Sequence, residues 1–288
     1  MSDQLTTSYR ASATLPLRVE FIRQLRRRRT LVAYLLVIAL PVMVSLAVKF
    51  GSNSGSNSGR RLGSGSADLV GLATAGAANF TVTMFFFAAG FLLLVIVALF
   101  CGDTVASEAS WSSLRYLLAA PVPRRRLLKQ KLIVGLTLSL GAIAILPVAS
   151  FVIGLIAFGS GPLQSPVGAT YSAAESLCRI AAIGGYIFVS LLFAAGVAFL
   201  MSVLTDAPLG AVGAAVVLVI ISNILNAIDA LGSLREWLPT HFSQAWLDLL
   251  ATDVEWTDMA RGAAYSVVAC AICVSYAVYR FDRKDVVS

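Results

Sequence analysis

The sequence predicts an all-α, polytopic membrane protein with about six transmembrane helices. Hydrophobic residues make up 58% of the 288 residues and charged residues only 13%, whereas soluble domains contain about 45–50% and about 25%. The charged residues also gather in short stretches between long uncharged runs, as in membrane-spanning chains. We therefore expect one transmembrane domain over 1–288, with a cytoplasmic N-terminus (1–30), a six-span region (31–279) and a cytoplasmic tail (280–288).

An amphipathic helix is expected just before the first span, between Leu15 and Arg29. Its apolar residues recur at helical spacing and arginines fill the other positions; the apolar set is Leu17, Phe21, Ile22 and Leu25. A helix of this kind lies in the membrane interface, with its apolar side among the headgroups and its arginines near anionic lipid. Membrane lipid is thus an expected partner.

Six apolar runs are long enough to cross a bilayer, for which about 20 helical residues suffice. These runs cover residues 31–48, 69–100, 132–158, 177–204, 209–228 and 260–279. The second run exceeds the required length and is expected to be tilted or to extend beyond the bilayer. Pro208 suits the first turn of a helix, so the fourth and fifth spans are expected to form a hairpin.

A mixed polar and apolar segment, residues 229–258, separates the last two spans. Phe242, Trp246 and Leu250 recur in it every four residues, and Trp237 adds a further aromatic side chain. Aromatic rings favour the headgroup level of a bilayer, so a flat interfacial helix is one interpretation. Trp237, Phe242 and Trp246 are candidate residues of an outer gate or interface.

The distribution of Lys and Arg predicts that both chain ends are cytoplasmic. Most of the 22 basic residues lie before residue 30, between residues 115 and 131, or after residue 279. Basic residues accumulate on the cytoplasmic side because moving them across the membrane is costly. This asymmetry also accounts for the net charge of +7 without nucleic acid as a partner.

The residues that usually carry chemistry are scarce. The spans hold essentially no ionisable side chains away from their ends, which argues against a proton relay or a carboxylate ion site. The only histidine, His241, has no obvious metal-ligand partners, and no Gly-Lys dipeptide of a nucleotide-binding loop occurs. We expect a non-catalytic chain with no metal site and no cofactor of its own.

The cytoplasmic connection between the second and third spans, residues 101–131, is the most informative segment. Trp111, Leu114, Leu117 and Leu118 give it an apolar face at helical spacing. Glu108, Arg115 and Arg124 surround this face, and Pro121 ends the helix. An exposed apolar face next to a basic cluster indicates a contact surface for another protein.

This connection resembles the ABC type-2 permease family. Members carry a Glu near the end of the second span, then Leu-Leu, Pro-Val, an Arg and a Lys that opens the third span; the matching residues are Glu108, Leu117, Leu118, Pro121, Val122, Arg124 and Lys131. The ending Phe281-Asp282-Arg283-Lys284-Asp285 and the six-span plan are also similar. The sequence departs from the family at Trp111-Ser112-Ser113, where a Gly-Thr pair is more common.

The resemblance implies the membrane-spanning permease subunit of an ATP-driven (ABC) exporter in a bacterial cell membrane. The implied coupling helix contacts ABC ATPase subunits through Glu108, Trp111, Leu114, Arg115, Leu117, Leu118, Pro121 and Arg124. ATP and Mg²⁺ would bind the partner ATPase, and a second permease chain, identical or related, would complete a dimer. The resemblance also implies re-entrant helices within 229–258, and efflux of an amphiphilic, lipid-like or drug-like substrate.

Other classes of membrane protein remain open from the residues alone. A secondary transporter would carry intramembrane charges or internal repeats, and a membrane enzyme would need convergent catalytic groups. A non-transporting subunit of a sensor or assembly complex has no distinguishing sequence feature. Gly210 and Ala214, four residues apart, suit a close helix contact either with a second chain or within this one.

Overall fold

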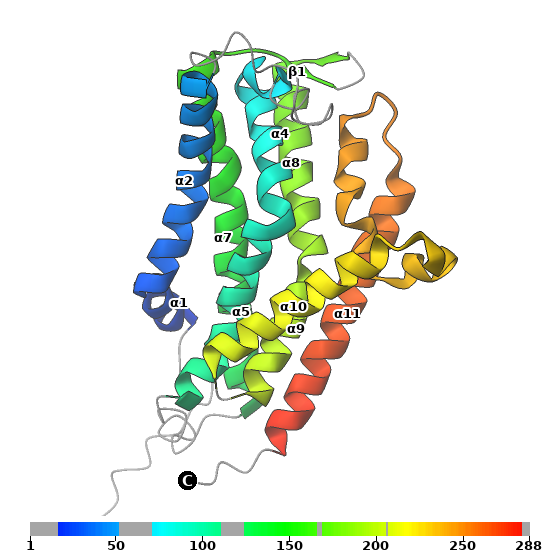
Figure 1. Ribbon diagram of the computed structural model, residues 1–288. Helices are drawn as coiled ribbons and strands as arrows, with labels where there is room; N and C mark the ends of the chain where they lie inside the picture. Colours follow the sequence, from blue (N-terminus) through cyan, green and yellow to red (C-terminus); the bar gives the residue numbers. More distant parts are fainter. Residues whose placement is uncertain (1–16, 52–70, 111–123, 166–168, 206, 284–288) are drawn as a thin grey trace, which may run out of the picture.

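The computed structural model describes residues 17–51, 71–110, 124–165, 169–205 and 207–283. Six helices in these ranges are long and apolar enough to span a membrane, which confirms an all-α polytopic membrane protein. Figure 1 shows them as one bundle, with the short helix α1 (Leu17–Leu25) and a small β-hairpin at opposite ends. We call these the α1 end and the hairpin end.

The six spans follow one another in sequence, and several are built from two helices. Their bounds are α2 (Arg28–Gly51), α4 with α5 (Ala77–Phe87 and Leu93–Ser110), α7 (Arg124–Phe158), α8 with α9 (Ala173–Ser190 and Leu192–Leu204), α10 (Pro208–Asn226) and α11 (Trp256–Asp282). Four of the predicted apolar runs lie within these helices, whereas the run 69–100 begins before α4 and the run 209–228 ends two residues beyond α10. The helices α5 and α7 extend further toward the α1 end than the apolar runs, because their polar residues there are buried against partners.

The surface of the bundle is apolar along the spans. Large side chains such as Ile156 and Leu209 are 78% and 85% exposed. Soluble monomers rarely expose apolar patches of this extent. Lipid is the environment in which such a surface is stable.

The second span contains a π-helical turn, η2 (Ala88–Leu92), between α4 and α5. The fourth span is interrupted at Leu191, between α8 and α9. Such irregular turns leave backbone groups that need partners, and within a membrane they occur where protein or a wet cavity surrounds them. Pro208 is the first residue of α10, as the sequence predicted.

The helix α9 lies at the centre of the bundle, packed between α5, α10 and α11, while α7 packs against α2, α4 and α5. Close approach of α9 to α11 depends on Gly196: a Cβ atom there would lie 2.8 Å from Cα of Cys270. Small residues permit this kind of helix contact in membranes, where dispersion forces hold helices together.

The hairpin end is closed by irregular structure. The helix α7 ends at Phe158 because Gly159 follows with a φ of 79°, a conformation that glycine adopts freely. The strands β1 (Leu163–Gln164) and β2 (Thr170–Tyr171) then pair antiparallel. Their two-residue length explains why no strand pattern was predicted. The side chain of Ser172 caps the N-terminus of α8.

Two 3₁₀ helices, η3 (Asp229–Trp237) and η4 (His241–Leu250), connect α10 to α11. In Figure 1, α10 crosses the bundle obliquely, and the segment after it projects outward before returning beside α8 and α11. Both α8 and α11 pack against η4. The predicted stripe Phe242, Trp246 and Leu250 forms the buried side of η4.

Candidate functional site

Charged side chains from four segments meet inside the α1 end of the bundle. They come from α1, from the turn into α2, from the last two turns of α5 and from the first turns of α7. Their acidic members are Glu20, Asp103 and Glu108, and their basic members are Arg23, Arg27, Arg29 and Lys131. We call this set the ion-pair network.

Lys131 and Glu108 form the most enclosed pair of the network. Nζ of Lys131 lies 2.7 Å from Oε1 of Glu108 and 3.6 Å from Oε1 of Glu20. Arg23 contacts both carboxylates as well, at 2.7 Å from Glu20 and directly against Glu108. The side chain of Lys131 is only 1% exposed and that of Glu108 only 3%. One lysine thus joins α1, α5 and α7.

A second cluster surrounds Asp103. Arg27 donates to Oδ2 of Asp103 at 3.0 Å and to Oγ of Ser107 at 3.2 Å, while Arg29 donates to Oδ1 of Asp103. Asp103 and Ser107 stand one helical turn apart, so both face the same side of α5. This cluster attaches the turn between α1 and α2 to the side of α5.

The local sequence explains why α1 turns a polar side inward. Glu20 and Gln24 are four residues apart, are both buried, and are joined by a hydrogen bond of 3.0 Å. The hydroxyl of Thr30 also donates to the backbone carbonyl of Gln24. The helix α1 is therefore attached to the bundle by polar groups on one side and by Phe21 and Leu25, which pack against the core.

The electrostatics of the network favour the ionised form of Glu20. Burial raises the pKa of this carboxyl, but the charge of Lys131 and hydrogen bonds from Arg23 and Gln24 outweigh burial, so that its pKa lies below the ordinary value. Burial alone would lower the pKa of Arg23, yet Glu20 and Glu108 raise it. Both groups are therefore charged at neutral pH.

The network holds together segments that lie far apart in the sequence. Each of its three carboxylates contacts two cationic side chains, and removing one partner of such a buried pair costs about 3–5 kcal/mol. Among the described residues, no three His, Cys, Asp or Glu side chains are grouped so that they could hold a metal ion. The network therefore holds α1, α5 and α7 together.

The predicted ATPase-contact residues are only partly placed. Glu108 lies in the network near the end of α5, and Arg124 is the first residue of α7. The others fall within 111–123, outside the described residues; they are Trp111, Leu114, Arg115, Leu117, Leu118 and Pro121. The structure thus places the two ends of the predicted coupling segment.

The predicted interfacial helix forms, but its charged residues face partly inward. Leu17 and Ile22 are exposed, whereas Phe21 and Leu25 pack against the core. Arg23 and Arg27 pair with carboxylates of α1 and α5, partners that the prediction of lipid-facing arginines did not include. Amphipathic spacing alone could not reveal those distant partners.

The predicted outer residues separate into buried and exposed ones. Trp237 is 72% exposed, whereas Phe242 and Trp246 are buried under η4. Polar groups hold η4 in place: Tyr186 donates to the carbonyl of Phe242 at 2.6 Å, and Tyr171 donates to that of Leu250 at 3.0 Å. Arg179 donates to the carbonyls of Leu249 and Ala251.

Sequence reasoning missed Glu20, Asp103, Arg23 and Arg27 as parts of a common site. A signal was present: Asp103 and Glu108 end an apolar span, and carboxylates at that depth require cationic partners. Which of the many arginines supplies the partner depends on how α1 folds back against α5. That contact spans more than 70 residues of sequence.

Comparison with known protein families gives a match over most of the chain. A family model described as "Protein of unknown function (DUF2705)" matches residues 66–287. The match includes Asp103, Glu108 and Lys131, whereas α1 and its Glu20 precede the matched region. No curated protein matches the chain.

Proposed function

The chain belongs to the family described as protein of unknown function (DUF2705), and we propose that it is the permease subunit of an ATP-driven exporter. In this proposal the chain provides the membrane path and a separate ABC ATPase provides the energy. The single observation that carries the proposal is the buried Lys131 and Glu108 pair. It joins the two helices on either side of the segment that resembles a coupling helix.

The position of this pair supports a mechanical role. Glu108 lies two residues before the end of α5 and Lys131 lies two turns inside α7, so residues 111–123 connect two helices that are already locked together. A force applied to the connection is therefore transmitted to both helices and, through Glu20, to α1. A loosely attached loop would absorb the same movement.

The proposed mechanism requires no bond chemistry in this chain. ATP and Mg²⁺ bind the partner ATPase, which binds one permease conformation better than the other and thereby shifts the equilibrium between them. The ion-pair network keeps α1, α5 and α7 moving as one body during this shift. The irregular turns at η2 and at Leu191 are the places where the spans can bend.

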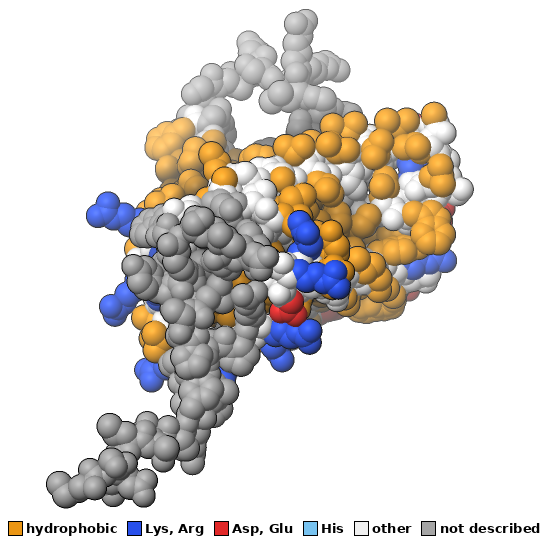
Figure 2. All heavy atoms as spheres, turned by 90° about the horizontal axis from the view of Figure 1, so that it is seen from below, with side chains coloured by type: hydrophobic (Ala, Val, Ile, Leu, Met, Phe, Trp, Pro, Cys, Tyr) orange, Lys and Arg blue, Asp and Glu red, His pale blue; other side chains and the backbone are white. Residues whose placement is uncertain are grey.

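We propose that the α1 end faces the cytoplasm of a bacterial cell. The start of α7 and the end of α11 meet at this end, where Arg125 donates to Asp282 at 2.8 Å. Figure 2 looks onto it and shows several Lys and Arg side chains among few acidic ones. An excess of basic residues is typical of the cytoplasmic side.

A second permease chain fits the surface of α10. Within one chain this helix buries only a narrow stripe, Ala211, Ala215, Val219 and Ser222. Gly210 is exposed, and a Cβ atom there would meet only Ala207, at 3.6 Å. The face of Gly210 and Ala214 is therefore available to another helix, as the predicted dimer requires.

Co-purification tests the proposal. The tagged chain, extracted in mild detergent from its own host, is expected to bring down an ABC ATPase whose hydrolysis rate rises in the complex. Glu108→Gln should reduce that stimulation several-fold, while Arg125→Ala, which removes an exposed pair, should leave it unchanged. Recovery of the folded chain without any ATPase would overturn the proposal and favour a non-transporting membrane subunit.

A further inference from the structure

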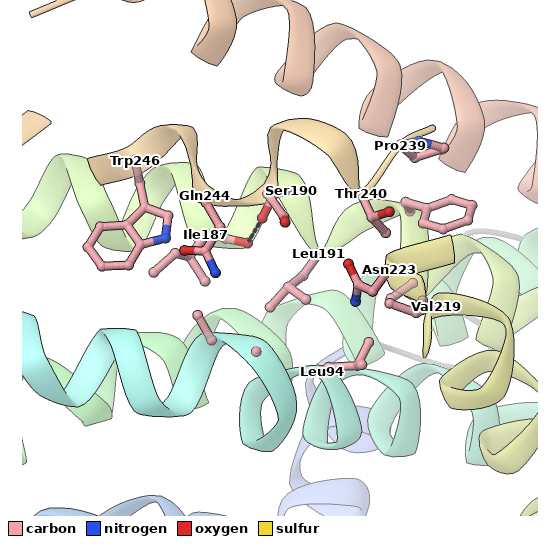
Figure 3. Close-up of a pocket in the computed structure, with 15 residues that line it drawn as sticks. Leu94, Ile187, Ser190, Leu191, Val219, Asn223, Pro239, Thr240, Gln244 and Trp246 are labelled. Atoms are coloured by element: carbon pink, nitrogen blue, oxygen red, sulfur yellow. Dashed lines mark hydrogen bonds between the residues drawn. The ribbon is translucent and has the colours of Figure 1, made fainter. Parts of the chain in front are cut away.

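A small cavity lies under η4, where four parts of the bundle meet. Its volume is about 60 Å³, room for roughly four or five water molecules. Figure 3 shows Trp246 and Gln244 approaching from η4, Ser190 and Leu191 from the α8–α9 junction, and Asn223 from α10. The π-helical turn contributes Ala89 and Gly90. Both irregular turns of the spans therefore border this cavity.

One buried polar atom in the cavity wall, Nε1 of Trp246, has no hydrogen-bond partner. The side chain of Trp246 is 1% exposed, and its Nε1 is buried without an acceptor. Figure 3 shows this nitrogen on the side of the ring that faces Gln244 and Ile187. Buried indole N–H groups are nearly always paired, because an unpaired buried donor costs about 1–3 kcal/mol.

The hydroxyl groups of Ser190 and Thr240 contact other groups and not the indole. Ser190 donates to the carbonyl of Ile187 at 2.9 Å, the dashed contact in Figure 3. Thr240 pairs with Ser222 at 2.7 Å. The indole N–H therefore remains a donor in the cavity wall that no described group accepts.

The rest of the wall defines the chemistry of that acceptor. The fifteen lining residues include Asn223, Thr240, Ser243 and Gln244 but no Asp, Glu, Lys, Arg or His. Burying an ion without a counter-charge is far more costly than burying a neutral polar group. An anionic headgroup is therefore disfavoured, and a pure hydrocarbon would leave Nε1 unpaired.

The cavity opens at the side of the bundle. Asn223, Gln244 and Gly90 are exposed at its edge. Phe91, which follows Gly90, and Ile220, one helical turn before Asn223, present exposed apolar side chains. Polar amides beside a lipid-facing surface are costly unless a ligand or protein group covers them. The arrangement offers a polar recess for a head and an apolar surface for a tail.

We propose that this cavity binds the uncharged, oxygen-bearing head of an amphiphile, with an ester or amide carbonyl accepting a hydrogen bond from Nε1 of Trp246. The amides of Asn223 and Gln244 pair with the remaining oxygens of the head, and the alkyl tail lies along the neighbouring apolar surface. This site concerns what the chain binds and not what drives it, so it is separate from the coupling to an ATPase.

Fluorescence of Trp246 tests the proposal in the full-length chain. Replacing Trp111, Trp237 and Trp256 by Phe leaves Trp246 as the single tryptophan, and the chain is reconstituted in lipid nanodiscs without ATPase or ATP. A brominated monoacylglycerol, whose head is an uncharged ester, is expected to quench Trp246 saturably. Excess unbrominated monoacylglycerol should reverse the quenching, and a brominated fatty acid in its anionic form should not saturate.

A variant that fills the cavity can be compared with a matched control whose new side chain lies elsewhere. A Cβ atom at Gly90 meets nothing within 4 Å, so Gly90→Leu places its side chain at the cavity without a backbone clash and should abolish saturable quenching. Gly185 also has open space around it but does not line the cavity, so Gly185→Leu should bind normally. Asn223→Leu should weaken binding between about two- and tenfold.

Three results would overturn the proposal. These are quenching that rises without saturation, as for bulk lipid; equal quenching by the anionic probe; and unchanged binding in Gly90→Leu. Because no ATPase is present, failure of this experiment leaves the proposed exporter role standing, and failure to recover an ATPase leaves this site standing.

Discussion

The ammonium group of Lys131 lies 2.7 Å from the carboxylate of Glu108, and both side chains are almost completely buried. They belong to different spans, α5 and α7, and stand 23 residues apart in the sequence. In a low-dielectric interior two such charges depend on each other, because removing either one leaves the other with only its second, less favourable partner. This dependence leads to the first prediction.

Removing one partner of this pair should destabilise the bundle strongly. Lys131→Met is expected to reduce the free energy of unfolding by about 3–5 kcal/mol, because it removes the buried cation of Glu20 and Glu108 and leaves them only the half-exposed Arg23. The measurement is denaturant unfolding in detergent. Arg125→Ala is the control: it removes an exposed pair with Asp282, which is worth about 0–1 kcal/mol. Equal losses of unfolding free energy in Lys131→Met and Arg125→Ala would contradict a structural role for the network.

Acid should weaken the attachment of α1. The folded-state pKa of Glu20 lies below its ordinary value of 4.5, since Lys131, Arg23 and Gln24 together outweigh burial. As the pH falls, the unfolded chain binds the proton first, so the stabilisation is complete above pH 4.5 and is lost as the pH falls through the folded-state pKa.

The test of this pH dependence compares melting temperatures of the wild type and Glu20→Gln between pH 7 and pH 3. The wild type should melt higher at neutral pH, and the difference should shrink below pH 4.5. Glu255→Gln, at an exposed position, serves as the control for loss of one carboxylate. A difference that grows on acidification would contradict the assigned ion pairs.

Gly196 should tolerate no side chain. A Cβ atom at this position would lie 2.8 Å from the backbone of Cys270 on α11, so Gly196→Ala forces the two central helices apart, at a cost of about 1–3 kcal/mol. Gly213 has open space around it, so Gly213→Ala should instead stabilise α10 slightly. Thermal unfolding of both variants provides the comparison, and a stable Gly196→Ala would show that α9 and α11 are further apart.

The proposed orientation makes a labelling prediction. In a Cys178→Ser background, which removes an exposed thiol, Arg125→Cys should react with a membrane-impermeant maleimide only after the cells are permeabilised. Trp237→Cys should react in intact cells, because it lies in the exposed segment between the last two spans. Reaction of Arg125→Cys in intact cells would reverse the topology and remove the proposed ATPase contact.

The amino-acid sequence by itself determined that the chain is helical and lies in a membrane, and which stretches span it. Those properties depend on the summed transfer free energy of about 20 neighbouring residues and on backbone hydrogen bonds made within each helix. Runs such as 132–158 and 209–228 therefore needed no knowledge of their neighbours. The sequence also marked Pro208 as a helix start, because proline acts locally.

Only the tertiary structure decided where the polar groups meet. The partners of Glu108 and Asp103 lie more than 70 residues away in α1 and the following turn, and many arginines in that region were equally plausible. The unpaired indole N–H of Trp246 likewise depends on how η4 folds over the π-helical turn and the α8–α9 junction. Charge pairing and cavity shape require three-dimensional proximity, which a local pattern of residues does not encode.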